Sequence, residues 1–148
     1  MKNIGLQLYT VREHLTSDEE IKALFEQIRG IGYTEVELFG AIENMEAPAR
    51  IANETGLDIS GTISNFKAYE DREKTVEFCR RFGIKNLGFS ASEFESAAEI
   101  ARLIGEANDL AEYLAKYGIT ISYHNHSHEF RKYENGKTAY EMMADGFD

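Results

Sequence analysis

Short apolar segments alternate with amphipathic helical segments five times along this chain of 148 residues. Strands that alternate with helices predict a parallel sheet with right-handed crossover connections. The repeat of roughly 30 residues is typical of a (β/α)8 TIM barrel. The strands are expected at residues 4–10, 35–39, 57–64, 86–90 and 119–123.

Capping residues and turn residues mark where the helices should begin and end. Serine or threonine followed three residues later by glutamate satisfies the free amides of a first helical turn, and this pattern begins at Ser17, Ser92 and Thr138. The helices are predicted at about 18–30, 45–55, 71–82, 92–117 and 139–144. Pro48 is compatible with its helix only near the first turn. Asn135-Gly136 predicts a tight hairpin turn after the fifth strand.

A doubly wound open sheet is the competing architecture. Such a sheet usually has a glycine-rich turn after its first strand, where phosphate binds. Here the turn is Tyr9-Thr10-Val11-Arg12-Glu13, which contains no glycine. We therefore predict the α/β class and a partial TIM barrel of about five parallel βα units, with a β-hairpin after the fifth strand. Residues 1–148 are predicted to be a single incomplete barrel domain.

Composition excludes several classes of partner. The formal net charge is −10, which disfavours binding to nucleic acid. No apolar run approaches the roughly 20 residues that span a bilayer, so we expect no membrane partner. The single cysteine, Cys79, excludes an internal disulfide framework and suits a reducing, cytoplasmic location. Its apolar helical surroundings predict a core residue rather than a nucleophile.

Three of the four histidines follow the fifth predicted strand, in the stretch Tyr123-His124-Asn125-His126-Ser127-His128. Side chains alternate along a strand, so the three imidazoles would share one face if the extended geometry continued. Imidazoles in that arrangement could bind a transition metal, bind a sugar hydroxyl or move a proton. We expect the functional site at this stretch.

Three motifs resemble one known family, and they occur in the same order along the chain. Residues 5–12 (GLQLYTVR) and 31–40 (IGYTEVELFG) resemble its first and second strands. Tyr123-His124-Asn125-His126, with Glu129-Phe130 and Gly136-Lys137-Thr138 downstream, resembles one branch of it. The chain is similar in these stretches to the sugar phosphate isomerase/epimerase family, the xylose isomerase-like TIM barrels.

The resemblance implies a divalent metal at the mouth of the barrel. The usual ligands are a glutamate, an aspartate, a histidine and a glutamate from the fifth to the eighth strands. His124 falls at the position of the first glutamate, so imidazole replaces a carboxylate. This replacement either removes the standard site for a divalent metal (Mn, Co, Mg or Zn) or shifts its preference toward the softer ions Mn, Co and Zn. The other three ligands belong to strands that follow the five predicted here.

Several further residues are candidates for the site. Glu37 interrupts an apolar strand, where a carboxylate needs a partner and its pKa can be tuned, so it and His126 are candidates for proton transfer. The alternative for Glu37 is a pair with a lysine or arginine. Gln7, Tyr9 and Asn125 are candidates for substrate binding, although Asn125 could simply hold the backbone. His14 and His128 are expected to lie on loops. Arg12 could bind a substrate anion, but a local salt bridge is the expected role.

The resemblance implies isomerisation or epimerisation of a small carbohydrate through a metal-stabilised enediolate. A keto-sugar lyase or hydratase would use the same enolate chemistry. The non-catalytic alternative is a truncated half-barrel that binds sugar or takes part in assembly. Five units cannot close an eight-stranded barrel, so the chain is expected to be a fragment or to form a homodimer that covers the open sheet. An endonuclease of this barrel superfamily is disfavoured by the acidic charge.

Overall fold

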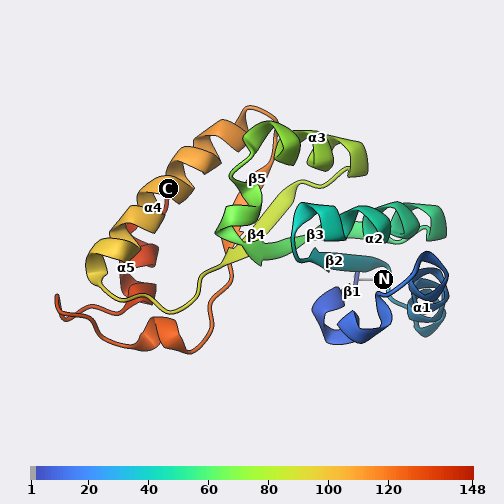
Figure 1. Ribbon diagram of the computed structural model, residues 1–148, viewed down its shortest axis with the longest axis horizontal. Coiled ribbons are helices and arrows are strands. Elements are labelled where there is room, and N and C mark those ends of the chain that lie inside the picture. Colours follow the sequence, from blue (N-terminus) through green and yellow to red (C-terminus); the bar gives the residue numbers. More distant parts are fainter. Residues whose placement is uncertain (1–2) are drawn as a thin grey trace.

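The computed structural model describes residues 3–148 and contains one parallel sheet of five strands (Figure 1). The order of the strands in the sheet is the order in the chain, and every strand pairs in parallel with its neighbour in sequence. This arrangement confirms the predicted partial barrel. The strands are β1 (Gly5–Gln7), β2 (Glu35–Phe39), β3 (Asp58–Asn65), β4 (Asn86–Ser90) and β5 (Thr120–Tyr123).

Helices connect the strands and follow the sheet along one side (Figure 1). The α-helices are α1 (Asp18–Ile31), α2 (Ile42–Thr55), α3 (Arg72–Phe82), α4 (Ala97–Ala115) and α5 (Ala139–Gly146). Three short 3-10 helices follow the ends of strands, namely η1 (Leu8–His14), η2 (Phe66–Tyr69) and η3 (His128–Phe130). In residues 3–148, no helix has both the length and the apolar character that crossing a bilayer requires.

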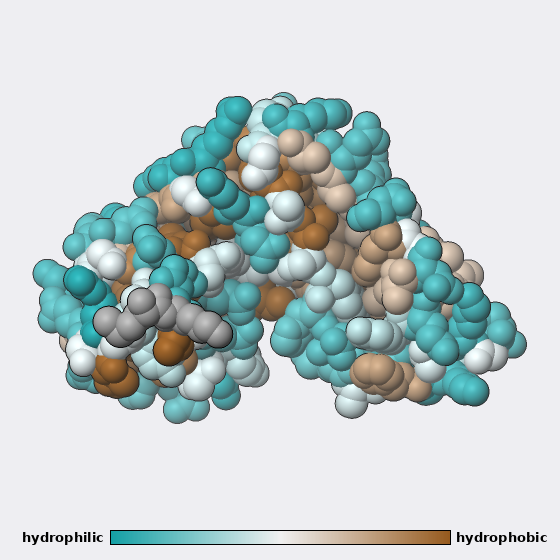
Figure 2. Space-filling view, turned by 180° about the vertical axis from the view of Figure 1, so that it is seen from behind, coloured by the Kyte–Doolittle hydropathy of each residue, from teal (hydrophilic) through white to brown (hydrophobic). Residues whose placement is uncertain are grey.

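The two faces of the sheet differ in burial. In β2, Val36 and Leu38 are fully buried, whereas Glu35, Glu37 and Phe39 between and beside them are partly exposed. The buried side chains pack against the helices and form the core, as the period of two in a strand requires. The other face is open, and Figure 2 shows the surface hollowed between two lobes. The partly exposed side chains of β2 thus lie on a face that no helix covers.

The first strand is shorter than predicted. Residues 4–10 were expected to be extended, but β1 ends at Gln7 and the chain turns into η1. This turn buries Leu8, which is 1% exposed. The guanidinium of Arg12 donates a hydrogen bond of 2.8 Å to the carbonyl oxygen of Tyr9 and closes the turn. Local hydrogen bonding and the burial of Leu8 therefore override the extended pattern after Gln7.

The start of α4 was also predicted wrongly. Two consecutive Ser-x-x-Glu patterns begin at Ser92 and Ser96, and the helix uses the second. The hydroxyl of Ser96 accepts a hydrogen bond of 3.3 Å from the backbone of Glu99. Phe94 is buried, and its carbonyl oxygen accepts a hydrogen bond from Arg131. These contacts hold the segment before Ser96 outside the helix.

Helix α2 begins at Ile42, three residues before the predicted start. Pro48 therefore lies in the second turn and not near the first turn. A proline at this position has no amide hydrogen for the carbonyl oxygen four residues earlier. Pro48 is buried, so it contributes to the packing of the core although it lacks this hydrogen bond.

The turn predicted at Asn135-Gly136 is present. The amide of Gly136 donates a hydrogen bond of 2.9 Å to the carbonyl oxygen of Tyr133. The amide of Tyr133 in turn donates one of 2.9 Å to the carbonyl oxygen of Lys137. Gly136 has a φ of 80°, which glycine adopts without strain. A single antiparallel bridge joins the two arms at Lys132 and Thr138.

Cys79 confirms its predicted place in the core. It lies in α3 and is fully buried. Burial raises the pKa of its thiol to about 12. A thiol that stays protonated at neutral pH is a poor nucleophile, so Cys79 serves packing.

Candidate functional site

The histidine stretch begins where β5 ends. The amide of His124 donates a hydrogen bond of 2.7 Å to the carbonyl oxygen of Phe89, which extends the pairing with β4 by one residue. β5 ends at Tyr123, the backbone at Ser127 is helical, with a φ of −85° and a ψ of −25°, and η3 begins at His128. The imidazoles nevertheless lie in a row, although not as continued strand geometry would place them. The ring centroids of His124 and His126 are 4.9 Å apart, and those of His126 and His128 are 5.6 Å apart.

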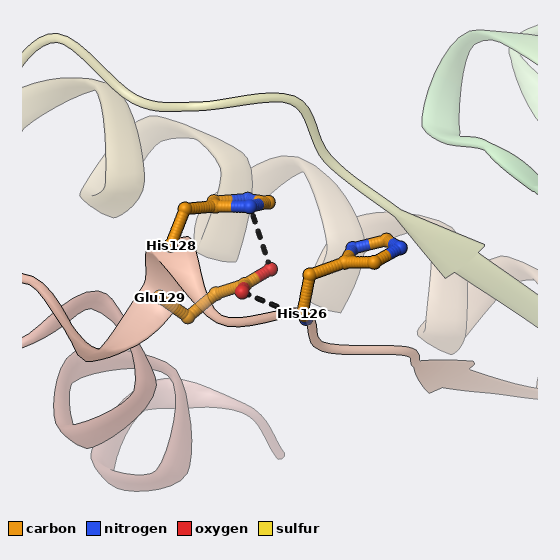
Figure 3. A group of neighbouring side chains, drawn as sticks. All are labelled: His126, His128 and Glu129. Carbon is orange, nitrogen blue, oxygen red and sulfur yellow. Dashed lines mark hydrogen bonds and ion pairs between the residues drawn. The ribbon is translucent and has the colours of Figure 1, made fainter.

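Glu129 is the residue around which this loop folds. Its side chain is fully buried. Its Oε1 accepts a hydrogen bond of 2.6 Å from the hydroxyl of Tyr123, and its Oε2 accepts one of 2.8 Å from the amide of His126. Figure 3 shows His126, His128 and Glu129 gathered at this point. A single carboxylate thus connects the end of β5, the loop and η3.

His128 lies against the same carboxylate. Its Nε2 is 3.1 Å from Oε1 of Glu129 (Figure 3). This nitrogen is buried, yet it makes no hydrogen bond of good geometry among the described residues. Ligand atoms of His126, His128 and Glu129 lie within 4.8 Å of one another. Two imidazoles and one carboxylate are a common donor set for transition metals in proteins.

The electrostatics of the loop keep Glu129 ionised. Burial alone would raise the pKa of its carboxyl. The hydrogen bonds from Tyr123 and from backbone amides, together with the neighbouring His128, outweigh burial and lower that pKa. Burial and the neighbouring carboxylate raise the pKa of the Tyr123 phenol, which therefore remains a neutral donor.

A second group of predicted residues lies on the first two strands. Gln7 and Glu37 face each other across the pairing of β1 with β2. The side-chain amide of Gln7 donates a hydrogen bond of 2.6 Å to Oε2 of Glu37. The alternative of a lysine or arginine partner for Glu37 is not observed within residues 3–148. Its partner is a neutral amide, and the carboxylate is partly exposed.

Tyr9 lies close to this pair along the chain but belongs to η1. Tyr9 is 52% exposed, and its ring meets the ring of Phe39 edge to face, with the centroids 5.4 Å apart. The guanidinium of Arg12 lies 4.3 Å above the same ring. Arg12 was expected to form a salt bridge, but it contacts the ring and the carbonyl oxygen of Tyr9 instead.

The remaining candidates lie on exposed loops. Asn125 is exposed, and its side-chain amide donates a hydrogen bond of 3.1 Å to the carbonyl oxygen of His126. This contact agrees with the backbone-holding alternative and leaves the exposed side-chain oxygen of Asn125 open to a substrate hydroxyl. His14 is exposed and lies 3.2 Å from Glu20, away from both groups. It behaves as the local loop residue that was expected.

The predicted residues therefore fall into two groups, both near the carboxyl ends of parallel strands. Gln7, Tyr9 and Glu37 belong to the first group, and His124, Asn125 and His126 to the second. In barrels this edge of the sheet carries the active site. The sequence placed Glu129 in a motif but gave neither Glu129 nor His128 a role in the site. A buried glutamate cannot be told from an exposed one in the sequence.

A cleft of 490 Å³ between η2 and α4 borders this site through Phe94. The ring of Phe94 lies 6.5 Å from that of His128. The arginines that line the cleft are already paired, Arg72 with Asp109 and Arg102 with Glu106. The cleft therefore offers no free cation to a substrate anion from these two side chains.

No family model matches the chain, and no curated protein matches it in sequence. Solved structures do match its fold. A sugar phosphate isomerase/epimerase from Parabacteroides distasonis superposes with a TM-score of 0.75 at 21% identity, over 99% of this chain and 62% of that one. A xylose isomerase-like TIM barrel protein from Mycobacterium smegmatis, in complex with magnesium, superposes with a TM-score of 0.61 at 12% identity, over 78% of this chain and 49% of that one. A xylose isomerase domain containing protein from Salmonella typhimurium superposes with a TM-score of 0.60 at 13% identity, over 83% of this chain and 50% of that one.

These likenesses show the fold and confirm the architecture expected from the resemblance. The five βα units have the arrangement of part of a xylose isomerase-like TIM barrel. The chain spans 62% of the first of these structures and about half of the other two.

Proposed function

We propose that this chain, with the fold of xylose isomerase-like barrels, acts on a small carbohydrate by metal-assisted enediolate chemistry. The reaction removes a proton from the carbon next to a carbonyl group and returns it elsewhere, which gives an isomer or an epimer. Loss of water after the same first step would instead give a lyase or hydratase of keto-sugars. A divalent metal, when bound, would stabilise the negative charge on the substrate oxygen.

The observation that carries this proposal is the pairing of Gln7 with Glu37 on the open face of the sheet. Glu37 is partly exposed and has a neutral amide as its partner, so its other lone pairs can accept a proton from a substrate. Gln7 would hold the carboxylate in place. This is the arrangement that a general base requires.

The histidine loop supplies the remaining groups of the proposal. His126 is exposed and would carry the second proton transfer. His124, at the position that the resemblance gives to a metal ligand, would bind the metal or the substrate oxygen. The donors are rich in nitrogen, which fits Mn, Co or Zn better than Mg. Tyr9 and Asn125, both exposed, would contact substrate hydroxyls.

The uncovered surfaces of the sheet favour a second copy of the chain as its partner. The strands β1 and β5 are the two edges of the sheet, and the face that carries Glu37 is not covered by helices. A second copy of the chain would cover these surfaces and could bring further groups to the site. Light scattering on the purified protein would distinguish one 16.8 kDa chain from two.

Hydrogen exchange with solvent tests the chemistry whichever product the reaction gives. The protein is incubated in D₂O with single aldoses, ketoses and keto-sugars and with Mn²⁺, Co²⁺ or Mg²⁺, and proton NMR follows the hydrogen next to the carbonyl. We expect this hydrogen to exchange with one class of sugar. Glu37→Gln should slow the exchange at least about 100-fold, within the range that general-base groups contribute.

The control for this experiment is His14→Ala, which lies outside the site and should exchange at the wild-type rate. Folded protein that binds a sugar, seen by line broadening of the sugar signals, but exchanges no hydrogen would contradict the enzymatic proposal. That result would favour the alternative of a non-catalytic half-barrel that binds sugar.

A further inference from the structure

We propose that His126, His128 and Glu129 form a metal site of their own, which takes a divalent transition-metal ion such as Zn²⁺. This site is distinct from His124, and it lies within four consecutive residues. It therefore needs no group from another strand or another chain. Binding of the ion at this site requires no sugar. A His126 imidazole bound to the ion would not carry the second proton transfer proposed above, so the two roles of His126 exclude each other within one chain.

The distances between the donor atoms fit a shared ion. Two ligands bound to one zinc ion at 2.0–2.1 Å with a tetrahedral angle lie roughly 3.3 Å apart. Nε2 of His128 and Oε1 of Glu129 are 3.1 Å apart. The ligand atom of His126 lies within 4.8 Å of the other two. Two of the three donors thus already have the spacing of a coordination shell.

The third donor can reach the same point by turning its side chain. The backbone of His126 is fixed, because its amide donates to Oε2 of Glu129. Its ring is exposed and stacks on the ring of His128, with an angle of 18° between the planes. A rotation about the side-chain bonds moves its nitrogen without moving the loop.

The buried negative charge of Glu129 also favours a bound cation. The carboxylate of Glu129 is fully buried and accepts hydrogen bonds from two neutral donors, Tyr123 and the amide of His126. Nε2 of His128 is buried beside it without a well-aligned hydrogen bond. A metal ion between them would neutralise the carboxylate and bind the nitrogen.

The donor set predicts which ions bind. Imidazole favours zinc and cobalt over magnesium and calcium, which prefer oxygen. Three protein ligands leave a fourth position of a tetrahedral ion for water or for an oxygen of a small molecule. We therefore expect Zn²⁺ and Co²⁺ to bind, and Mg²⁺ to compete poorly.

Titration with Co²⁺ followed by visible absorption, and with Zn²⁺ by calorimetry, tests the site directly. We expect one ion per chain, with Zn²⁺ displacing Co²⁺ and Mg²⁺ failing to do so. His126→Ala and His128→Ala should each weaken binding at least tenfold, as should Glu129→Gln. Circular dichroism is recorded for each variant to establish that it is folded.

His14→Ala is the matched control, since it removes one exposed imidazole and leaves the three donors intact. We expect it to bind Zn²⁺ with wild-type affinity, and His124→Ala shows whether the metal-ligand position proposed above contributes to binding of the same ion. Unchanged affinity in His126→Ala and His128→Ala, or a loss confined to His124→Ala, would overturn the proposal. Should Glu129→Gln unfold, the two histidine variants still decide the matter, because His126 is exposed and can be removed without disturbing the core.

Discussion

Glu37 and Glu129 are the same side chain in opposite surroundings. Glu37 lies on the open face of the sheet, partly exposed, with the amide of Gln7 at 2.6 Å. Glu129 is fully buried, accepts hydrogen bonds from the hydroxyl of Tyr123 and the amide of His126, and lies beside the imidazole of His128. A carboxylate with free lone pairs can take a proton from a substrate, whereas one whose oxygens are both engaged fixes a loop and its ligands. The number of fixed partners separates the two roles.

Replacing Glu129 with leucine gives the largest expected effect. The change leaves the hydroxyl of Tyr123 and the amide of His126 without partners in a buried place. Unsatisfied buried groups cost about 1–3 kcal/mol each, so the free energy of unfolding should fall by roughly 3 kcal/mol or more. Urea denaturation followed by circular dichroism measures the loss. Glu37→Leu is the matched control, and an equal loss in both variants would remove the contrast between the two carboxylates.

Lowering the pH should destabilise the fold by protonating Glu129. Its pKa is lowered in the folded chain by the hydrogen bonds that outweigh its burial. A group with a depressed folded pKa stabilises the fold above its unfolded pKa, near 4.5, and this stabilisation is lost as the pH falls through the folded value. One such group changes the free energy of unfolding by at most about 1.4 kcal/mol per pH unit. Denaturation between pH 3 and pH 6 should show a shallower decline in Glu129→Gln than in the wild type.

Removing one donor gives a smaller effect. Tyr123→Phe deletes the hydroxyl that donates to Oε1 of Glu129 at 2.6 Å and leaves the ring in place. The loss of one hydrogen bond to a charged group should cost roughly 1.5 kcal/mol and should raise the pKa of Glu129. Thermal unfolding at pH 7 and at pH 4 measures both consequences. A melting temperature equal to that of the wild type at both values would show that the hydroxyl contributes nothing to this contact.

Glu37→Gln should have the smallest effect on stability. The side chain is partly exposed, and glutamine can still accept a hydrogen bond from Gln7. Substitutions of this kind usually change the free energy of unfolding by less than about 0.5 kcal/mol. Urea denaturation should therefore give curves that superpose, although hydrogen exchange on the substrate is expected to be lost. A loss above roughly 2 kcal/mol would place Glu37 in the same class as Glu129.

The alternation of strands and helices was predictable because it depends on periodic apolar residues, which the sequence displays directly. The parallel order, the buried Cys79 and the turn at Asn135-Gly136 follow from such local rules. The start of α4 was not predictable, because Ser92 and Ser96 offer the same pattern. What decided between them was the burial of Phe94, a tertiary contact.

The candidate site was predictable only in part, for the same reason. The histidines identified the loop, and Glu37 was visible as a charge within an apolar strand. The contact of Gln7 with Glu37 follows from the register of β1 with β2, which the sequence does not state. The role of Glu129 depends on a turn at Ser127 that breaks the extended geometry. Residues brought together by such a turn share no period along the chain.

The matching order of strands in the sheet and in the chain has a consequence for how the molecule folds. Each new strand adds to the edge left by the one before it, so no pairing has to wait for a distant segment. Contacts between near neighbours in sequence favour rapid folding, and the early units can form while the rest is still being synthesised. The histidine loop depends on the pairing of β4 with β5 through the carbonyl oxygen of Phe89. Its ligands can therefore come together only after β5 has joined the edge left by β4.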